Sequence, residues 1–186
     1  LNSKVSVVNE DILKFNFASI VGSYKIVANI PYYLTSNLIR ILSDINNPPT
    51  RATLLVQQEV AERINASVGD MSKLSVFTQN IFETEVGTIV EARYFEPPPK
   101  VNSQVIILKL RAQSLVEEAI FPIFQQVVKA GFSEKRKKLR SSLSGGLHLT
   151  KAEVDQLIEK ADIKKDARAQ ELNISDWVKI ATNYKK

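Results

Sequence analysis

The chain has 186 residues, 44% hydrophobic and 24% charged, which is typical of a globular protein with a sizeable core. It has no cysteine and one histidine, which excludes a disulfide scaffold and thiolate zinc sites, argues against histidine-based chemistry and fits a reducing compartment. No apolar run approaches the roughly 20 residues of a membrane span, so we expect no membrane partner. The lack of cysteine and the single histidine also lead us to expect no metal. The net charge of +5 favours a polyanionic partner.

The first part of the chain alternates between strand-like and helix-like patterns. Strands are predicted at 4–8, 25–29, 52–57, 84–90 and 104–110, and helices at 35–43, 58–64 and 73–81. The strand at 25–29 is expected to be buried, and the apolar run at 52–57 is expected to be covered on both faces. Three prolines at 97–99 cannot continue a ladder, so the last two strands should form an antiparallel pair at a sheet edge. The order predicts an α/β fold with a mostly parallel sheet.

After about residue 112 the pattern becomes helical throughout. Helices are predicted at 116–130, 134–143, 151–161 and 175–184. Thr150 and Glu153 have the spacing of a capping box, and Ser175 is the predicted N-cap of the last helix. Residues 113–186 carry 14 Lys and Arg against 10 Asp and Glu, a net charge of +4, whereas the remainder carries +1. We therefore predict two domains, 1–112 and 113–186, with the basic excess in the second.

The most informative stretch is Asn29-Ile30-Pro31-Tyr32, which follows an apolar strand. Ligands of open α/β sheets bind at the carboxyl ends of the strands. An asparagine there can point its side-chain carbonyl out of the sheet, and the proline removes a donor and leaves nearby main-chain carbonyls free as acceptors. Acceptors beside an aromatic ring suit a planar group with an NH2, so we predict a site for the amino group of a nucleobase. The alternative is a loop that only closes a strand.

Two further stretches could complete such a site. Between the last two strands, Phe95 is predicted to lie on the other side of the target base, with Lys100 near a phosphate. This stretch is also a rigid connection, which could be its whole role. Asp11 follows the first predicted strand and is either part of a solvated turn or an acceptor for a ligand such as an adenine amino group.

Five cations occur within six residues at 135–140. They are Lys135, Arg136, Lys137, Lys138 and Arg140. Such a run is often a solvated helix face, but this density of like charge repels itself and is better explained by phosphate contacts. We therefore predict a nucleic-acid-binding helix here. The lone His148 adjoins a Gly-Gly turn and is interpreted as a surface or local packing residue.

Seven motifs in order resemble one known family. They are NEDILKFNF, VANIPYYLTSNLI, LLVQQEVAERI, KLSVFTQ, FEPPPKVNSQVIIL, GFSEKRKKLRSSL and RAQELNISDW. Together they resemble the KsgA-type ribosomal RNA adenine N6,N6-dimethyltransferases, with the Erm methyltransferases as near neighbours. The last two motifs lie in the helical part and favour the KsgA type.

The resemblance implies a class I, Rossmann-like methyltransferase that uses S-adenosylmethionine. Its implied substrate is a pair of adjacent adenosines near the 3′ end of small-subunit rRNA, each methylated twice. Asp11 resembles the acid that meets the cofactor's adenine, and Asn29 resembles the asparagine of the catalytic Asn-Leu/Ile-Pro-Tyr motif and should also adjoin the cofactor. Pro31 and Tyr32 complete that motif. Phe95 resembles the second aromatic residue near the target base.

Three features depart from the family pattern. Asn102 stands where aspartate is usual, and Ser72 where glycine is common. No Gly-x-Gly pattern, which the family's cofactor loop requires, occurs in the sequence. In the class I sheet order 3-2-1-4-5-7-6, that loop belongs to strand 1, so we expect strands 1 and 2 to precede Leu1. This isolated chain should then bind S-adenosylmethionine weakly or not at all and have little activity, and micromolar binding in calorimetry would contradict this expectation.

The implied partner is small-subunit rRNA or an immature small ribosomal subunit, met by a cytoplasmic monomer. Two alternatives remain open. One is an Erm-type enzyme that acts on large-subunit rRNA. The other is a non-catalytic RNA-binding assembly factor on the same fold, against which the retained Asn29 and Tyr32 argue.

Overall fold

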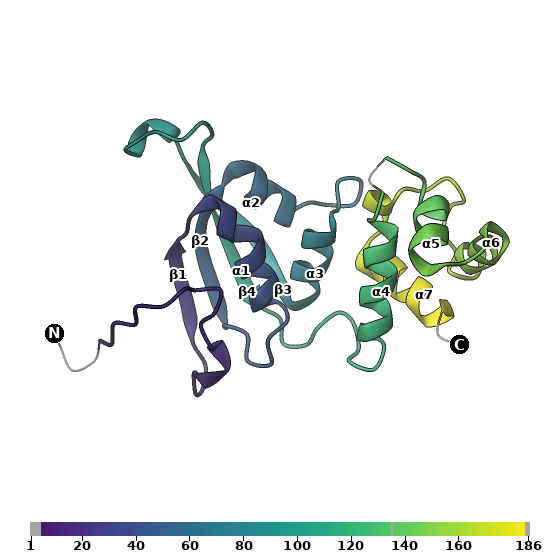
Figure 1. The fold of residues 1–186 in the computed structure, drawn as a ribbon, viewed down its shortest axis with the longest axis horizontal. Coiled ribbons are helices and arrows are strands. Elements are labelled where there is room, and N and C mark those ends of the chain that lie inside the picture. The colour runs from purple at the N-terminus through teal and green to yellow at the C-terminus, as the bar shows by residue number, and fades with distance from the viewer. Residues whose placement is uncertain (1–4, 135, 185–186) are drawn as a thin grey trace.

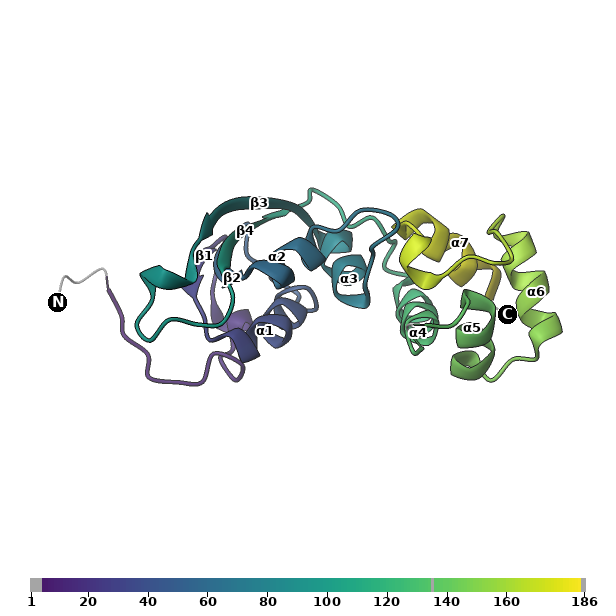
Figure 2. The same cartoon turned by 90° about the horizontal axis from the view of Figure 1, so that it is seen from above.

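The computed structural model describes residues 5–134 and 136–184. Within these residues the chain forms a sheet with helices against one face, followed by a second group of helices (Figure 1). The view from above shows that the two groups lie side by side along the long axis, with helix α3 between them (Figure 2).

The described strands form one sheet. They are β1 (Lys25–Asn29), β2 (Arg51–Gln57), β3 (Phe82–Val90) and β4 (Ser103–Leu110). Their order is β1-β2-β4-β3, which corresponds to the 4-5-7-6 part of the class I sheet. The predicted antiparallel pair is confirmed, with β3 at the edge beside β4. Among the described strands only β1 and β2 pair in parallel, so the expectation of a mostly parallel sheet is wrong for this part of the chain.

Three helices cover one face of the sheet. They are α1 (Thr35–Leu42), α2 (Gln58–Ile64) and α3 (Lys73–Ile81). Alternate residues of β2, namely Ala52, Leu54 and Val56, are fully buried in the core on this side. Burial of a leucine side chain such as Leu54 contributes roughly 1.5–3 kcal/mol, so this face holds the sheet and helices together.

The opposite face and the outer edge of β1 are less covered. Val27 in the middle of β1 is 85% exposed, and Leu55 of β2 is half-buried. The expectations of a buried strand at 25–29 and of a strand at 52–57 covered on both faces are therefore wrong for the described structure. No described helix packs on that face, and no described strand pairs with the free edge of β1.

Residues 5–8 are extended and exposed but are not part of the sheet. The strand predicted at 4–8 is therefore not formed over the described residues. A run of β-branched residues has strand propensity, but a strand needs a partner for its backbone groups, and no described strand pairs with this segment.

The second group of helices has its own core. It contains α4 (Phe121–Gly131), α5 (Leu139–Leu147), α6 (Lys151–Lys160) and α7 (Ile174–Tyr184). Trp177 is fully buried there and its ring adjoins Gly131, where a Cβ would overlap the indole. The absence of a side chain at Gly131 thus lets α4 and α7 approach closely.

Two helices begin later than predicted. The helix predicted at 116–130 begins at Phe121, and Pro122 lies in its first turn, where a missing N–H costs nothing. The helix predicted at 134–143 begins at Leu139. Lys138 is its extended N-cap residue, so Arg136, Lys137 and Lys138 precede the helix, whereas Arg140 lies in its first turn.

The cap of α6 is confirmed and that of α7 is different. Thr150 and Glu153 form the predicted reciprocal capping box. At α7 the backbone N–H of Asp176 donates to the Asn173 side chain, and the Asp176 carboxylate accepts from the Asn173 N–H. Ser175 therefore lies inside the helix, and Asn173 is the cap.

The buried hydrophobic residues form two clusters. One joins the sheet to α1 and α2, and the other joins the four later helices. Val76 of α3 belongs to the second cluster, while Leu74 and Ile81 of the same helix pack against the first. Because α3 contributes to both, the division near residue 112 stays a prediction.

Candidate functional site

One edge of the sheet brings several loops together. β1 and β2 end there, at Asn29 and Gln57, because they run in parallel. β4 is antiparallel to both of its neighbours and begins at this edge with Ser103, which pairs with Gln57 on one side and Val90 on the other. The loop after β1, the start of α2 and the loop between β3 and β4 therefore converge.

Asn29 presents a free polar group at this edge. It is the last residue of β1, is exposed, and its side chain makes no hydrogen bond to a described residue. The next side chain, Ile30, is buried in the core and anchors the loop. The Ile30 carbonyl accepts no backbone hydrogen bond from the described residues, whereas the Pro31 carbonyl accepts the Leu34 N–H at 3.0 Å. Nearby main-chain carbonyls are expected to be free acceptors. The Pro31 carbonyl is already hydrogen-bonded, whereas the Ile30 carbonyl is available.

Tyr32 begins a 3-10 turn, Tyr32–Leu34, that leads directly into α1. Its ring is half-buried, and its hydroxyl lies 2.9 Å from the hydroxyl of Ser103 on β4. This contact joins residues 71 positions apart and fixes the tip of the tyrosine against the sheet edge.

Phe95 and Lys100 lie in the loop between β3 and β4, which projects from the sheet in Figure 1. Phe95 is half-buried and follows a 3-10 turn, Ala92–Tyr94, whose first N–H donates to the Asn102 side chain at 3.1 Å. Lys100 is exposed. No ring contact joins Phe95 to Tyr32 among the described aromatic pairs. The rings thus come from two loops that meet at the same edge, and neither stacks on the other.

Asp11 lies in a turn. Its side chain is exposed and accepts the Leu13 N–H at 3.0 Å, and its carbonyl accepts from Lys14 and Phe15. The turn is held to the sheet by Phe17, which is buried in the same core as β2. No hydrogen bond joins Asp11 to the Asn29 loop in the described residues. The turn interpretation is confirmed, and its role toward a cofactor stays a prediction.

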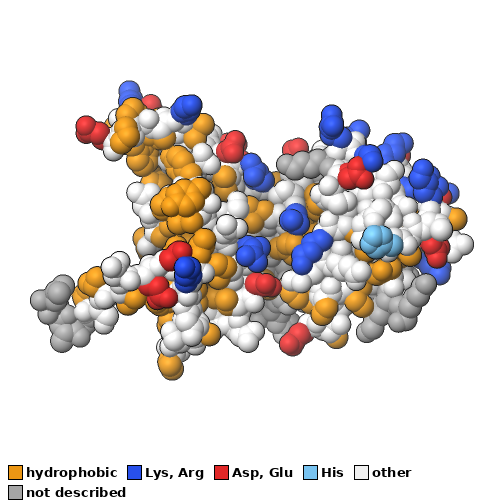
Figure 3. All heavy atoms as spheres, viewed as in Figure 1, with side chains coloured by type: hydrophobic (Ala, Val, Ile, Leu, Met, Phe, Trp, Pro, Cys, Tyr) orange, Lys and Arg blue, Asp and Glu red, His pale blue; other side chains and the backbone are white. Residues whose placement is uncertain are grey.

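The described part of the cationic run that precedes α5 forms an exposed loop. Arg136, Lys137 and Lys138 are exposed, and Lys135 lies outside the described residues. Lys137 forms an ion pair with Glu134, three residues earlier. Lysine and arginine side chains gather on the upper side of the helical group in Figure 3. Arg168 also belongs to this surface, because its guanidinium donates to the Arg136 carbonyl at 3.3 Å.

Arg140 has a partner inside the helical group. Its guanidinium donates two short hydrogen bonds, of 2.5 and 2.6 Å, to the two oxygens of Asp155 on α6. These bonds and the positive charge hold the pKa of Asp155 below its usual range, and the bonds from Arg140 are the main cause. Arg140 thus joins α5 to α6, so its predicted RNA contact has less support than those of Arg136 and Lys138.

Comparison with known proteins agrees with this geometry. The family model described as "Ribosomal RNA adenine dimethylase" matches residues 1–186, the whole chain. The chain belongs to the ribosomal RNA adenine dimethylase family.

Curated relatives of the chain carry the name "Ribosomal RNA small subunit methyltransferase A". The relative from Caldanaerobacter subterraneus subsp. tengcongensis is 36% identical over 95% of the chain and 68% of its own length. The relative from Clostridioides difficile is 35% identical over 92% of the chain and 62% of its own length. The relative from Dehalococcoides mccartyi strain 195 is 31% identical, and the chain spans 62% of that protein's length.

Two solved structures share the dimethylase fold. The chain is similar to the crystal structure of the 23S rRNA methyltransferase ErmE, with a TM-score of 0.72 and 25% identity, over 96% of this chain and 71% of that one. It is also similar to a dimethyladenosine transferase from Plasmodium falciparum, with a TM-score of 0.75 and 24% identity, over 93% and 70% of the two chains. The second likeness concerns the fold alone.

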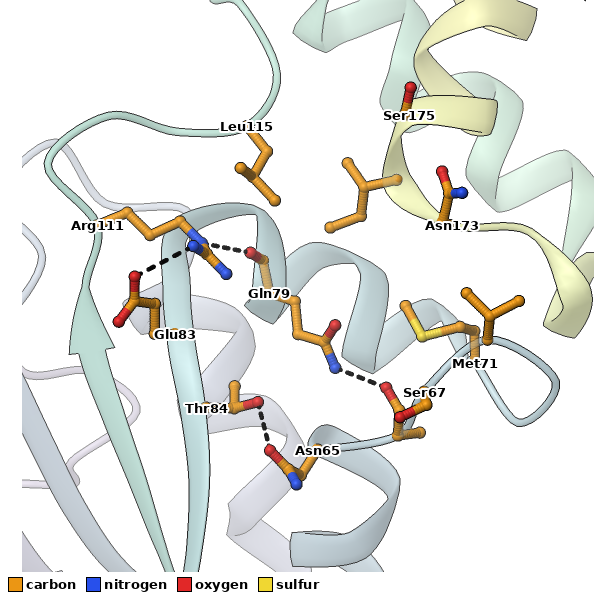
Figure 4. A pocket seen from close by; sticks show the side chains of 13 residues that line it. Asn65, Ser67, Met71, Gln79, Glu83, Thr84, Arg111, Leu115, Asn173 and Ser175 are labelled. Carbon is orange, nitrogen blue, oxygen red and sulfur yellow. Dashed lines mark hydrogen bonds and ion pairs between the residues drawn. The ribbon is translucent and has the colours of Figure 1, made fainter.

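A polar cleft of about 650 Å³ separates the sheet and its helices from α7, and Asn29 is not among the residues that line it (Figure 4). Its polar side chains mainly contact other residues that line the cleft. Arg111 contacts the Gln79 carbonyl and Glu83, and Thr84 donates to Asn65. The Gln79 amide donates to two carbonyls at the end of α2. The cleft is therefore interpreted as a junction between the two groups of helices.

Sequence reasoning assigned no role to Ser103, although the residue lies within one of the seven motifs. Its only local signal is its position directly before an apolar strand. His148 is exposed, as the surface interpretation predicts. Over the described residues, no cluster of three or more His, Cys, Asp or Glu could hold a metal ion. None of the described helices combines the length and apolar character needed to cross a membrane.

Proposed function

We propose that the chain carries the acceptor side of an rRNA adenine N6,N6-dimethyltransferase that acts on two adjacent adenosines near the 3′ end of small-subunit rRNA. The observation that carries this proposal is the pair of free acceptors at the sheet edge, the Asn29 side chain and the Ile30 carbonyl. Beside them the Tyr32 ring is held by its hydroxyl. Membership of the dimethylase family supports the same reaction.

The two acceptors address the main chemical difficulty. The exocyclic nitrogen of adenine is a poor nucleophile because its lone pair is delocalised into the ring. Asn29 Oδ1 and the Ile30 carbonyl accept the two N6 hydrogens, which favours a pyramidal nitrogen whose lone pair is free to attack. The N6 proton leaves after transfer, when the nitrogen is cationic and acidic, so no strong base is needed. Orientation then supplies most of the rate.

Two residues of this chain would hold S-adenosylmethionine, whose sulfonium supplies an electrophilic methyl group. Asp11 uses Oδ1 to accept from Leu13 and accepts no hydrogen bond through Oδ2 from the described residues. Oδ2 is therefore able to accept from an adenine amino group. Asn29, at the end of strand β1, would lie between the methyl donor and the target base.

The RNA is proposed to lie along the exposed cations. Lys100 lies in the loop that carries Phe95, and Arg136, Lys137 and Lys138 precede α5. Such side chains bind phosphates without reading sequence, so they would set the affinity and its salt dependence. Tyr32 and Phe95 would stack on the two faces of a base taken out of its helix.

The proposed setting is a cytoplasmic monomer that binds the immature small ribosomal subunit. A second candidate is an Erm-type activity on large-subunit rRNA, which the similarity to ErmE favours. A non-catalytic assembly factor would have no need of the two free acceptors at Asn29 and Ile30.

A methylation assay with the full-length protein separates these functions. Immature small subunits and large-subunit particles are each supplied with radiolabelled methyl donor. We expect label on small-subunit adenosines, and Asn29→Ala should lower the rate about 100–1,000-fold, as loss of one oriented polar group at a reacting centre does. Asn37→Ala, an exposed asparagine on α1, is the matched control.

Each other outcome selects a different function. Label on the large subunit alone would favour the Erm-type activity. Binding to particles without label from either would favour the assembly factor. Full activity of Asn29→Ala would contradict the proposed mechanism.

A further inference from the structure

Two consecutive residues, the last of the β3–β4 loop and the first of β4, contact three different segments of the site. Ser103 holds Tyr32, and the Asn102 side chain holds the turn before Phe95. The Asn102 carbonyl accepts the N–H of Gln58, the first residue of α2, at 3.0 Å.

The position of Ser103 is closely fixed. The residue is fully buried and pairs with Gln57 of β2 and with Val90 of β3, so its backbone is held from both sides. The Tyr32 hydroxyl, 2.9 Å from that of Ser103, is therefore bound to a rigid point. The Tyr32 ring takes part in no described aromatic contact, so this bond is the polar contact that orients the ring.

The contact at Asn102 acts on the other aromatic residue. Its Oδ1 accepts the N–H of Ala92 at 3.1 Å, and Ala92 begins the 3-10 turn that ends at Phe95. The Phe95 N–H in turn donates to the Ala92 carbonyl at 3.1 Å. Asn102 thus holds Phe95 through one short turn.

We propose that Asn102 and Ser103 are positioning residues that set the separation of the two aromatic walls. Because the two residues are adjacent in the chain, Tyr32 and Phe95 are both held from the same point at the start of β4, which would pre-organise the two rings for a base. The role rests on the proposed function, since it needs a base as the occupant. It also gives a reason for an acceptor at 102, which either asparagine or aspartate supplies.

Kinetics of the full-length protein test the contact between Ser103 and Tyr32. Ser103→Ala should lower kcat about tenfold with an unchanged KM for the methyl donor, because orientation is lost while cofactor contacts remain. Tyr32→Phe keeps the ring and removes the hydroxyl, so it should have the same effect. The double variant should be no slower than either single one, because both remove the same bond. Ser103→Thr, which keeps the hydroxyl, should restore most of the rate.

The kinetic results also have outcomes that overturn the inference. Multiplying effects of Ser103→Ala and Tyr32→Phe would show that the two residues act separately. Wild-type kcat in Ser103→Ala would show that the bond does not matter for the reaction. An equal loss in Ser103→Thr and Ser103→Ala would also reject the hydroxyl as the cause.

Hydrogen exchange on the 186-residue chain tests the geometry without any activity. Asn102→Ala should raise the exchange rate of the Ala92 and Phe95 amides about tenfold or more, while Asn102→Asp should not. Ser103→Ala should likewise raise the exchange rate of the Leu34 amide, which donates to the Pro31 carbonyl in the Tyr32 turn. Melting temperatures near wild type would show that the effects are local.

The two proposals can fail separately. An inactive wild-type protein would reject the proposed function, and exchange rates would then still decide the positioning contacts. Unchanged exchange in Asn102→Ala and Ser103→Ala would overturn the inference even in an active enzyme.

Discussion

The sheet group (β1–β4 with α1–α3) and the helical group (α4–α7) differ in how completely they bury their apolar side chains. The helical group surrounds a closed core, with Trp177 fully buried and its cations outside. The sheet group buries one face and leaves Val27 and the Asn29 edge exposed. The edge therefore carries acceptors that have no partner among the described residues, contribute little to stability and are available for chemistry. Substitutions in the two groups should separate stability from function.

The largest expected effect is in the helical core. Trp177→Ala should lower the free energy of unfolding by about 3–5 kcal/mol, because a large side chain leaves a cavity. Thr182→Ala, on the exposed side of the same helix, is the control and should change little. Urea denaturation followed by circular dichroism measures both. A loss below that of the control would show that the core is not closed around the indole.

A substitution that adds volume to the helical core, instead of removing it, tests the same packing. Gly131→Ala places a methyl group against Trp177 and should cost about 1–3 kcal/mol through overpacking. Gly145→Ala, also in a helix but with open space around its Cβ, should be neutral or stabilising. The difference between the two melting temperatures is the measurement, and equal values would contradict the close approach of α4 and α7.

At the sheet edge we expect loss of function without loss of stability. Phe95→Ala should weaken binding of an end-labelled rRNA fragment that carries the target adenosine by about 1–3 kcal/mol, the contribution of one stacked base. The melting temperature should stay near wild type, because Phe95 is only half-buried in a projecting loop. Leu115→Ala, which lies elsewhere and is exposed, is the control. An unaltered affinity for the fragment would contradict a place for Phe95 in the site.

The exposed cations before α5 should determine how steeply the affinity for RNA falls as the salt concentration rises. Replacing Arg136 and Lys138 with alanine should reduce the slope of log affinity against log salt by roughly 0.7–0.9 for each phosphate that the variant no longer binds. Lys151 and Lys160, both on α6, supply a control pair with the same loss of charge. Titration with an rRNA fragment at several salt concentrations measures the slopes. Equal slopes in the two double variants would show a general effect of charge.

The smallest expected effect concerns pH. Arg140 lowers the pKa of Asp155, so the carboxylate binds its proton less readily in the folded state. The pair therefore stabilises the fold above the ordinary carboxyl pKa of about 4, and this contribution is lost as the pH falls through the lowered value. Asp155→Asn should remove that part of the acid dependence and change little else, because the pair is partly exposed. Melting curves between pH 2 and pH 7, about the range of carboxyl titration, would show it; identical curves would exclude a contribution from the pair.

The sequence by itself determined much of the local structure. The bounds predicted for β2, α2, α3 and β4 agree with the structure to within one residue. The capping box of Thr150 and Glu153 was also predictable. These features depend on periodicity and on neighbours three or four residues away, which a sequence displays directly. The Asn29 motif was visible for the same reason.

Only the tertiary structure decided which distant residues meet. The Tyr32–Ser103 and Arg140–Asp155 contacts depend on how strands and helices pack, and no local pattern encodes such pairs. Packing also decided that Arg136 and Lys138 form a loop, because α5 begins only where Leu139 enters the core. The strand at 25–29 was predictable, but its exposure depends on which elements cover the sheet.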